Sequence, residues 1–226
     1  MSEGPQDADS GRFAVLDVFG ITLEVSNPRL AELLTMDASD ALTSDVRDLA
    51  SADRRAVSEA LPDSIIAMPN PHSEAAERTR REFRTLADAL AADIGFTVES
   101  DGTWCSPTGI DIVMRTVDRP LTPAAAAHYV SEVAAVTERL PETSTVLFVV
   151  ADQQTADAFK VAIRQRKLHN LMRTIAIDSL ESVREMHADG RLDHRHVLVL
   201  LAPIADIDVG EMIAVFRAGA PAPGGD

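Results

Sequence analysis

Cysteine, lysine, aromatic residues and long apolar runs are all scarce in this chain of 226 residues. The single cysteine, Cys105, excludes an internal disulfide and a cysteine-rich zinc site. The longest apolar run, 197–203, has the length of one buried strand, so we expect no membrane span. The first residues carry no basic and apolar signal-peptide pattern. Together these features predict a protein of the reducing cytoplasm, with a core built from aliphatic side chains because aromatic residues make up only 4%.

Several catalytic signatures are also missing from the sequence. There is no Walker A loop, no GxGxxG, no GxSxG and no HExxH. We therefore do not expect nucleotide hydrolysis by a P-loop or standard serine hydrolysis.

Negative charge dominates the chain. It has 36 acidic residues against 21 basic ones, a net charge of −15, and its only lysines are Lys160 and Lys167. Acidic, lysine-poor sequences are typical of halophiles that accumulate salt, where molar salt shortens the Debye length to roughly 3 Å. In such salt the acidity reflects adaptation to the solvent and says little about partners. At low salt, a surface this acidic repels nucleic acid and anionic membranes over most of its area.

The positions of proline and glycine residues along the chain predict two structural units. Residues 12–62 read as a small α+β unit, a β-hairpin around Gly20 followed by helices, and they are a candidate surface for a protein partner. The remaining boundaries follow from composition: a polar leader at 1–11, a proline-containing linker at 63–72, an α/β domain at 73–218 and a tail at 219–226.

Helical and strand patterns alternate in the larger segment, which predicts an α/β fold with a mixed, mainly parallel sheet flanked by helices. The continuous apolar run 145–151 is typical of a central strand, and Asp101-Gly102 indicates a hairpin turn. The expected helices are 73–93, 122–140, 155–165, 180–187 and 211–217, and the expected strands are 96–99, 110–116, 145–151, 174–177 and 196–202.

Two short motifs follow the first long helix of this segment, GFTVE at 95–99 and GIDIV at 109–113. Their order resembles the restriction-endonuclease-like fold, and is closest to its Mrr-type branch. The next helix, the buried strand VLFVVAD, a further helix and the strand RTIAID are also similar to that family. The resemblance covers about residues 73–187.

The resemblance implies a divalent-metal nuclease site. In this family the Asp of the GID strand binds the metal, an acidic residue on the first helix helps, and a following strand carries E/Q-x-K. Asp111 therefore corresponds to the metal ligand for Mg²⁺, with Glu82 or Glu99 as a second carboxylate. The alternatives are a strand-edge carboxylate for Asp111 and a solvated helix residue for Glu82.

The chain departs from the family pattern directly after the GID strand. Residues 117–123 contain two prolines and lead into a helix, which leaves no room for the E/Q-x-K strand. Arg115 shares a strand face with Asp111, but arginine is too basic to move protons as lysine does. We therefore predict a catalytically degenerate, nucleic-acid-associated protein, with a non-catalytic interaction or regulatory scaffold as the alternative.

A basic cluster lies further along the chain. The fourteen residues from 160 to 173 contain no Asp or Glu and include five cations, Lys160, Arg164, Arg166, Lys167 and Arg173. Such a cluster on an acidic chain is a candidate contact for the phosphates of DNA or RNA. The alternative is a solvated helix face whose cations are favoured by the helix dipole.

A second polar group, Asp193-His194-Arg195-His196, precedes the apolar run 197–203. Two histidines two residues apart share one face of a strand, where they can bind a metal. A polar turn that enters a buried strand is the alternative.

Overall fold

The computed structural model of the chain describes residues 14–18, 21–25, 74–137, 140–141, 143–203 and 209–218. Strands β1 (Ala14–Val18) and β2 (Ile21–Val25) pair antiparallel in a two-stranded sheet, as the hairpin pattern predicts. The predicted leader, the helices of the 12–62 unit, the linker and the tail lie outside the described residues.

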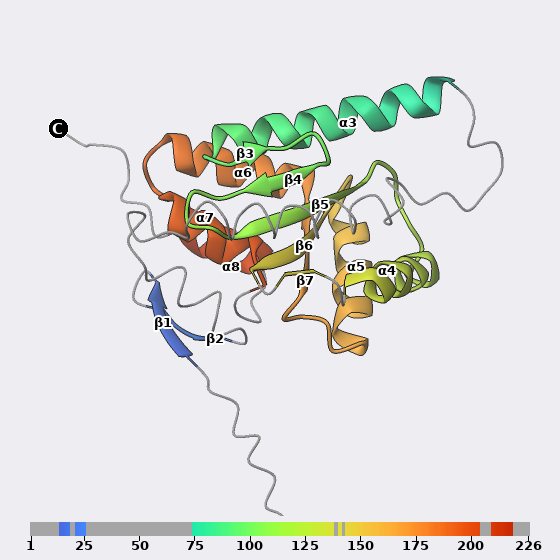
Figure 1. The fold of residues 1–226 in the computed structure, drawn as a ribbon. Coiled ribbons are helices and arrows are strands. Elements are labelled where there is room, and N and C mark those ends of the chain that lie inside the picture. The colour runs from blue at the N-terminus through green and yellow to red at the C-terminus, as the bar shows by residue number, and fades with distance from the viewer. Residues whose placement is uncertain are drawn as a thin grey trace, which may run out of the picture.

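The larger segment contains a five-stranded mixed sheet in the order β3-β4-β5-β6-β7 (Figure 1). Strands β3, β4 and β5 pair antiparallel, whereas β5, β6 and β7 pair parallel over longer registers. The predicted α/β class is therefore confirmed. The strand bounds are β3 Thr97–Val98, β4 Thr103–Cys105, β5 Asp111–Val117, β6 Ser144–Val150 and β7 Met172–Ala176.

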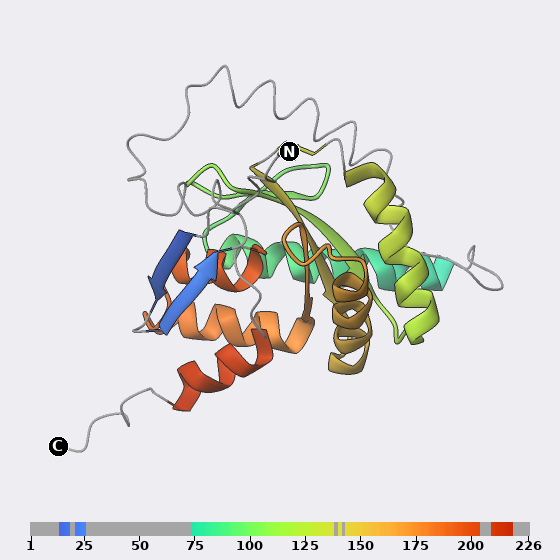
Figure 2. The same ribbon diagram turned by 90° about the horizontal axis from the view of Figure 1, so that it is seen from below.

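Helices cover both faces of this sheet (Figure 2). One apolar core joins α3, α6, α7 and α8 to one face, and a second core joins α4 and α5 to the other. No helix in the described part of the chain combines the length and apolarity needed to cross a membrane. The helix bounds are α3 Glu74–Asp93, α4 Pro123–Thr137, α5 Gln153–Gln165, α6 Ile177–Ala188, α7 His194–Leu201 and α8 Val209–Ala218.

Alternation along β5 separates the two cores. Ile112 and Met114 enter the core beneath α3, whereas Val113 and Val117 enter the core beneath α4 and α5. Every residue of β6 is buried, which confirms the central strand predicted from the run 145–151. The face of the sheet toward which a polar side chain of β5 points therefore follows from its parity, that is, from whether its residue number is odd or even.

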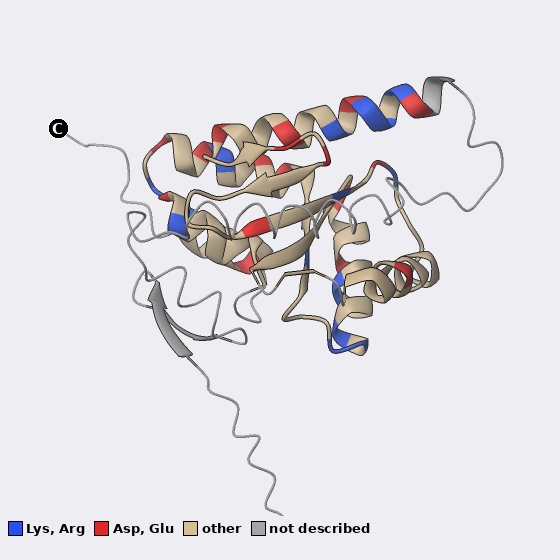
Figure 3. Ribbon diagram, viewed as in Figure 1, with Lys and Arg blue, Asp and Glu red and all other residues tan. Residues whose placement is uncertain are grey.

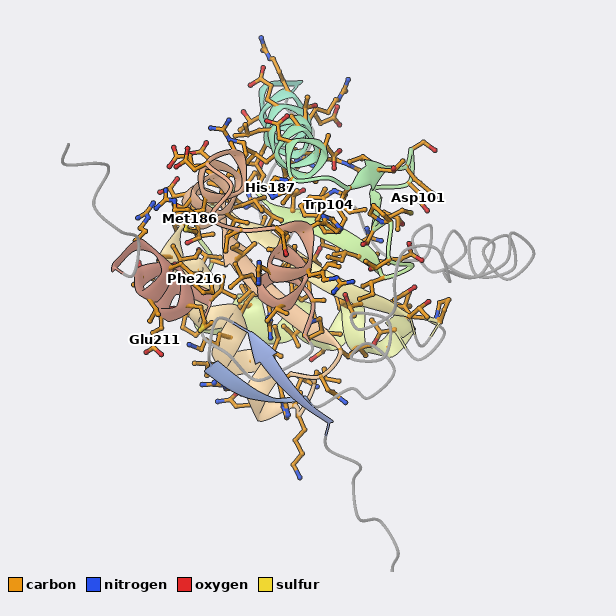
Figure 4. The ribbon with its side chains drawn as sticks, turned by 90° about the vertical axis from the view of Figure 1, so that its left-hand side faces the viewer. Asp101, Trp104, Met186, His187, Glu211 and Phe216 are labelled. Atoms are coloured by element: carbon orange, nitrogen blue, oxygen red, sulfur yellow. The ribbon has the colours of Figure 1, made fainter. Side chains whose placement is uncertain are left out.

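Glycines and a threonine mark the ends of helices and the hairpin turn where the sequence predicts them. Gly95 and Gly102 adopt positive φ angles of 95° and 84°, the first just past the end of α3 and the second in the turn between β3 and β4. The Thr122 hydroxyl accepts a hydrogen bond from the N–H of Ala125 at 3.3 Å, beside the first turn of α4. Trp104, labelled in Figure 4, packs between α3 and the sheet and is fully buried.

The predicted strand at 196–202 is wrong, because these residues form α7. All five residues from Val197 to Leu201 are buried, so their pattern has no amphipathic period, and a buried helix then reads like a buried strand. A capping box decides the outcome: the Asp193 side chain accepts from the His196 N–H at 2.9 Å, and the His196 ring accepts from the Asp193 N–H. Pro203 then follows the helix.

The start of α6 also differs from the prediction. The helix begins at Ile177, directly after β7, and its N-cap Ala176 makes no side-chain hydrogen bond. Asp178 therefore lies in the first turn of the helix, where its carboxylate is favoured by the helix dipole, and does not cap it.

Candidate functional site

The predicted basic cluster surrounds the end of α5 and the edge strand β7. Lys160 and Arg164 lie on α5, Arg166 is its C-cap, and Lys167 follows. Figure 3 shows blue ribbon in the lower part of α5 and in the turn that follows it, away from the mixed charges of α3. Arg164, Arg166 and Lys167 are exposed, and Lys160 is half-buried. We call these four cations together with Arg173 of β7 the basic edge.

Lys167 adopts a left-handed backbone conformation with φ of 58°. Its N–H bonds the Arg164 carbonyl at 3.0 Å, and the next N–H, of Leu168, bonds the Ile163 carbonyl, which reverses the chain toward β7. A lysine in this region costs about 1 kcal/mol more than glycine would. This left-handed residue and its two backbone bonds close the C-terminal end of α5.

A pocket of about 60 Å³ lies beside β7, the last strand of the described sheet. Its walls come from α5, from β7 and from the first turns of α6 and α8. Three of the predicted cations, Lys160, Arg164 and Arg173, line it together. The polar lining also includes Asp157, His169, Thr174 and Ser179. The fold thus brings α5 and β7 cations to one concave site.

Arg173 reaches this pocket as a buried group. Its side chain is 7% exposed, and Nη1 donates to the carbonyls of Val199 and Leu200 at 2.8 and 2.9 Å. These carbonyls belong to the last turn of α7, where the helix dipole favours a cation. The guanidinium is therefore held in a fixed position, and it also joins β7 to α7.

The predicted catalytic residues are divided between the two faces of the sheet. Asp111 and Arg115 share the parity of Val113 on β5 and so lie on the face of α4 and α5. Cys105 lies opposite Asp111 on that face, and its thiol donates to Glu99 Oε1 at 3.4 Å. The structure thus brings Glu99, Asp111 and Arg115 to one face.

Glu82 lies apart from these residues. It is exposed on α3, and α3 packs against the opposite face through Ala87, Leu90 and Ile94. Arg115 itself is buried, and its Nη1 donates to the Met114 carbonyl at 2.8 Å. Among the residues that the structure describes, no three His, Cys, Asp or Glu side chains gather as the ligands of a metal would.

Asp111 and the basic edge lie at the same end of the sheet. Asp111 begins β5 opposite Ser144, and Met172 begins β7 opposite Val146, so both strands start near one end of β6. Two strand spacings separate them, roughly 10 Å. Lys160 and Arg164 of α5 approach on the face that carries Asp111, whereas Arg173 shares the parity of Ile175 and extends toward α7 on the other face.

His194 occupies a site that sequence patterns did not indicate. Its Nδ1 lies 2.9 Å from the Ile94 carbonyl and must carry the proton, so Nε2 accepts from the Ser106 hydroxyl at 2.8 Å. A Cβ on Gly95 would come within 3.0 Å of Nδ1, so glycine permits this approach. Because Ser106 and His194 are 88 residues apart, no local motif joins them.

The chemistry of this Ser–His pair is structural. The Ser106 oxygen also bonds the Thr108 hydroxyl at 2.9 Å and accepts from the Thr108 N–H at 3.1 Å, so its hydrogen-bonding capacity is used. Burial lowers the pKa of His194, which keeps the imidazole neutral. Both ring nitrogens are therefore occupied by hydrogen bonds. His194 and His196 point to different partners, so the predicted shared face for a metal does not form.

Comparisons with known proteins identify no relative, since no family model, curated protein or solved structure matches this chain.

Proposed function

We propose that this chain binds nucleic acid through the basic edge and does not cleave it. The observation that carries the proposal is the convergence of Lys160, Arg164 and Arg173 on one pocket, in a chain whose net charge is −15. Arg166 and Lys167 extend the same positive surface into solvent. Phosphate contacts of this kind supply most of the affinity in sequence-independent binding.

The acidity of the remaining surface supports a local interface. A strongly negative protein repels a polyanion everywhere except where cations outnumber carboxylates. The second basic stretch, Arg78 to Arg84 on α3, does not meet this condition, because the acidic residues Glu74, Glu77, Glu82 and Asp88 interleave with its four arginines, whereas the residues from 160 to 173 contain no Asp or Glu. The basic edge is therefore the better candidate for phosphate contact.

The surroundings of Asp111 support binding without cleavage. A divalent metal that activates water for phosphodiester cleavage needs several oxygen ligands in close contact. Glu99 lies two strands from Asp111 and accepts from Cys105, and Glu82 lies on the far side of the sheet. Asp111 is thus the one residue of the implied site that stands at a strand start near the basic edge.

The decisive test is nucleic-acid binding as a function of potassium chloride. We expect Lys160→Gln/Arg164→Gln/Lys167→Gln to weaken DNA or RNA binding and to reduce the slope of log affinity against log salt by about two to three, at roughly 0.9 per lost duplex contact. The matched control is Arg78→Gln/Arg80→Gln/Arg81→Gln on α3, which removes the same charge elsewhere and should change the slope little. Equal effects of both variants would contradict a local interface.

A cleavage assay with Mg²⁺ or Mn²⁺ tests the second half of the proposal. Wild type and Asp111→Ala should both leave DNA and RNA intact while binding them equally. Metal-dependent cleavage by wild type that is lost in Asp111→Ala would show an active nuclease and overturn the non-catalytic part.

An interaction or regulatory scaffold is the second candidate function. Strand β7 is the last strand of the described sheet, and an edge strand offers backbone groups to an added strand of a partner. If neither DNA nor RNA binds at low salt, this second function is favoured over nucleic-acid binding.

A further inference from the structure

We infer that the pocket beside β7 receives the terminal phosphate of a nucleic-acid strand, while the exposed cations contact phosphates further along it. The inference rests on the proposed function and adds the chemical group that the site selects. The phosphate would lie between α5 and β7, in the pocket that Lys160, Arg164 and Arg173 line.

The dimensions of the pocket favour an end over an internal phosphate. Its volume of about 60 Å³ corresponds to about four to six ordered waters, at roughly 10–15 Å³ for each. This is room for a single phosphate group. Walls from α5, β7, α6 and α8 line it and leave it partly open to solvent, and an internal phosphate would need room for chain on both sides. A terminal phosphate needs one exit only.

The charge of the pocket fits a phosphate monoester better than a diester. Three positive charges and the single negative charge of Asp157 give a formal charge of +2. A phosphate monoester carries about −1.5 to −2 at neutral pH, whereas an internal diester carries a single negative charge. Asp157 also accepts from Gln153 at 3.0 Å, so this carboxylate is oriented along α5.

The donors in the pocket include groups prepared before binding. Arg173 is more than nine-tenths buried and is fixed by its two bonds to α7 carbonyls. The buried hydroxyl of Thr174 lines the same pocket and has no hydrogen-bond partner among the described residues. One fixed cation and an unsatisfied hydroxyl are suited to the oxygens of a terminal phosphate.

The experiment compares one labelled single strand in three forms, with a 5′-phosphate, with a 3′-phosphate and with hydroxyls at both ends. We expect one phosphorylated form to bind wild type about tenfold more tightly than the hydroxyl form, the gain of one charge-assisted contact. Lys160→Gln and Thr174→Val should each reduce this preference. Arg166→Gln, a matched charge loss outside the pocket lining, should weaken all three forms equally. Added inorganic phosphate should abolish the difference in affinity between the phosphorylated and the hydroxyl strands, and should leave the binding of the hydroxyl strand unchanged.

The outcomes separate this inference from the proposed function. Equal binding of the three strands, still weakened by the triple charge-removal variant, would overturn the terminal-phosphate site and leave nucleic-acid binding intact. Failure of every strand to bind would overturn both. Saturable binding of inorganic phosphate without any preference among strands would assign the pocket to a small phosphorylated ligand and overturn the inference. Urea denaturation of each variant checks that it is folded. If Thr174→Val does not fold, Lys160→Gln still tests the inference.

Discussion

At the scale of single residues, His194 connects three segments that are distant in sequence. It contacts the end of α3 through the Ile94 carbonyl and the β4–β5 turn through Ser106. The Phe96 ring packs edge-on against it, with centroids 4.8 Å apart. A neutral imidazole satisfies all of these contacts at once. Protonation would add a charge to a site that burial has already made unfavourable for one.

This arrangement predicts a pH-dependent stability. Burial holds the pKa of His194 below its ordinary value of 6.5, and burial also lowers the pKa of His196. The unfolded chain therefore binds more protons just below pH 6.5, so the free energy of unfolding is highest above pH 6.5 and declines as the pH falls toward the folded-state pKa values. Urea denaturation at pH 7.5 and at pH 5 measures this decline.

His194→Asn should lower the free energy of unfolding at pH 7.5 by about 1–2 kcal/mol, because it loses the Ser106 bond. It should also make the decline toward pH 5 shallower. His128→Gln, at an exposed site on α4, serves as the control and should keep the wild-type slope. A wild-type slope in His194→Asn would show that the pH response comes from elsewhere.

Asp88 is a second residue whose charged form is disfavoured by burial. It accepts from the buried Trp104 indole at 2.9 Å, and burial raises its pKa above the ordinary 3.8, against the opposing effects of the Trp104 bond and Arg84. Because the folded state holds the proton more tightly, stability falls as the pH rises through this raised pKa. At pH 7 the ionised carboxylate therefore opposes folding.

Asp88→Asn should keep the acceptor, remove the charge and leave stability at pH 7 equal to wild type or higher, within about 1 kcal/mol. Asp88→Ala should cost about 1–3 kcal/mol, because the indole N–H loses its partner in a fully buried position. Chemical denaturation of both variants checks the order, and a stability of Asp88→Asn as low as that of Asp88→Ala would contradict it.

At the scale of elements, the link between β7 and α7 has the clearest energetic consequence. Arg173 is buried and donates to two carbonyls in the last turn of α7. Those carbonyls have no partner within their own helix, so the guanidinium replaces the hydrogen bonds that a following turn would supply. Figure 4 shows the neighbouring layer, with Met186 on α6 and Phe216 on α8 at the same side of the molecule.

Arg173→Met should lower the free energy of unfolding by about 2–4 kcal/mol, because two buried carbonyls lose a charged donor. Arg164→Met, an exposed position on α5, should cost less than about 0.5 kcal/mol. Thermal and urea unfolding of the pair measure the difference. Equal stabilities would mean that the two bonds contribute nothing. For this reason Arg173 is left unchanged in the binding variants above.

At the scale of the whole molecule, negative charges are in large excess over positive ones. A net charge of −15 on 226 residues destabilises the compact state, and salt screens this repulsion. Raising potassium chloride from 0.1 to 2 M should therefore increase the melting temperature, on the order of 5 °C or more. Calorimetry at several concentrations checks this. A flat or falling curve would contradict a stability limited by repulsion, and potassium sulfate at matched ionic strength controls for specific anion effects.

Salt should also have opposite effects on the two properties of the molecule. Screening strengthens the fold, but it weakens contacts between the basic edge and phosphates. Binding should therefore be measured at salt concentrations where the protein is folded, so that a loss of affinity is not caused by unfolding. The triple charge-removal variant becomes slightly more acidic overall, so its stability should depend on salt at least as steeply as that of wild type.

Much of the fold was determined by the sequence alone. Amphipathic spacing, glycines that end helices and the apolar run at 145–151 predict α3, α5 and β6 close to their observed bounds, because these signals are local. The segment at 194–201 misled the prediction for the opposite reason. It is buried on every side, so the choice between helix and strand depended on the Asp193 cap and on packing against other elements.

Some features of the candidate site were likewise visible in the sequence, and others were not. The sequence by itself showed five cations in fourteen residues, since composition along the chain is visible without a fold. The three-dimensional arrangement was needed to show that Arg173 is buried against α7 and that three cations share a pocket. It was also needed to show that Glu82 and Asp111 lie on opposite faces of the sheet. The physical reason is that hydrogen bonds and cavities join residues by distance in space, and strand order sets that distance independently of separation along the chain.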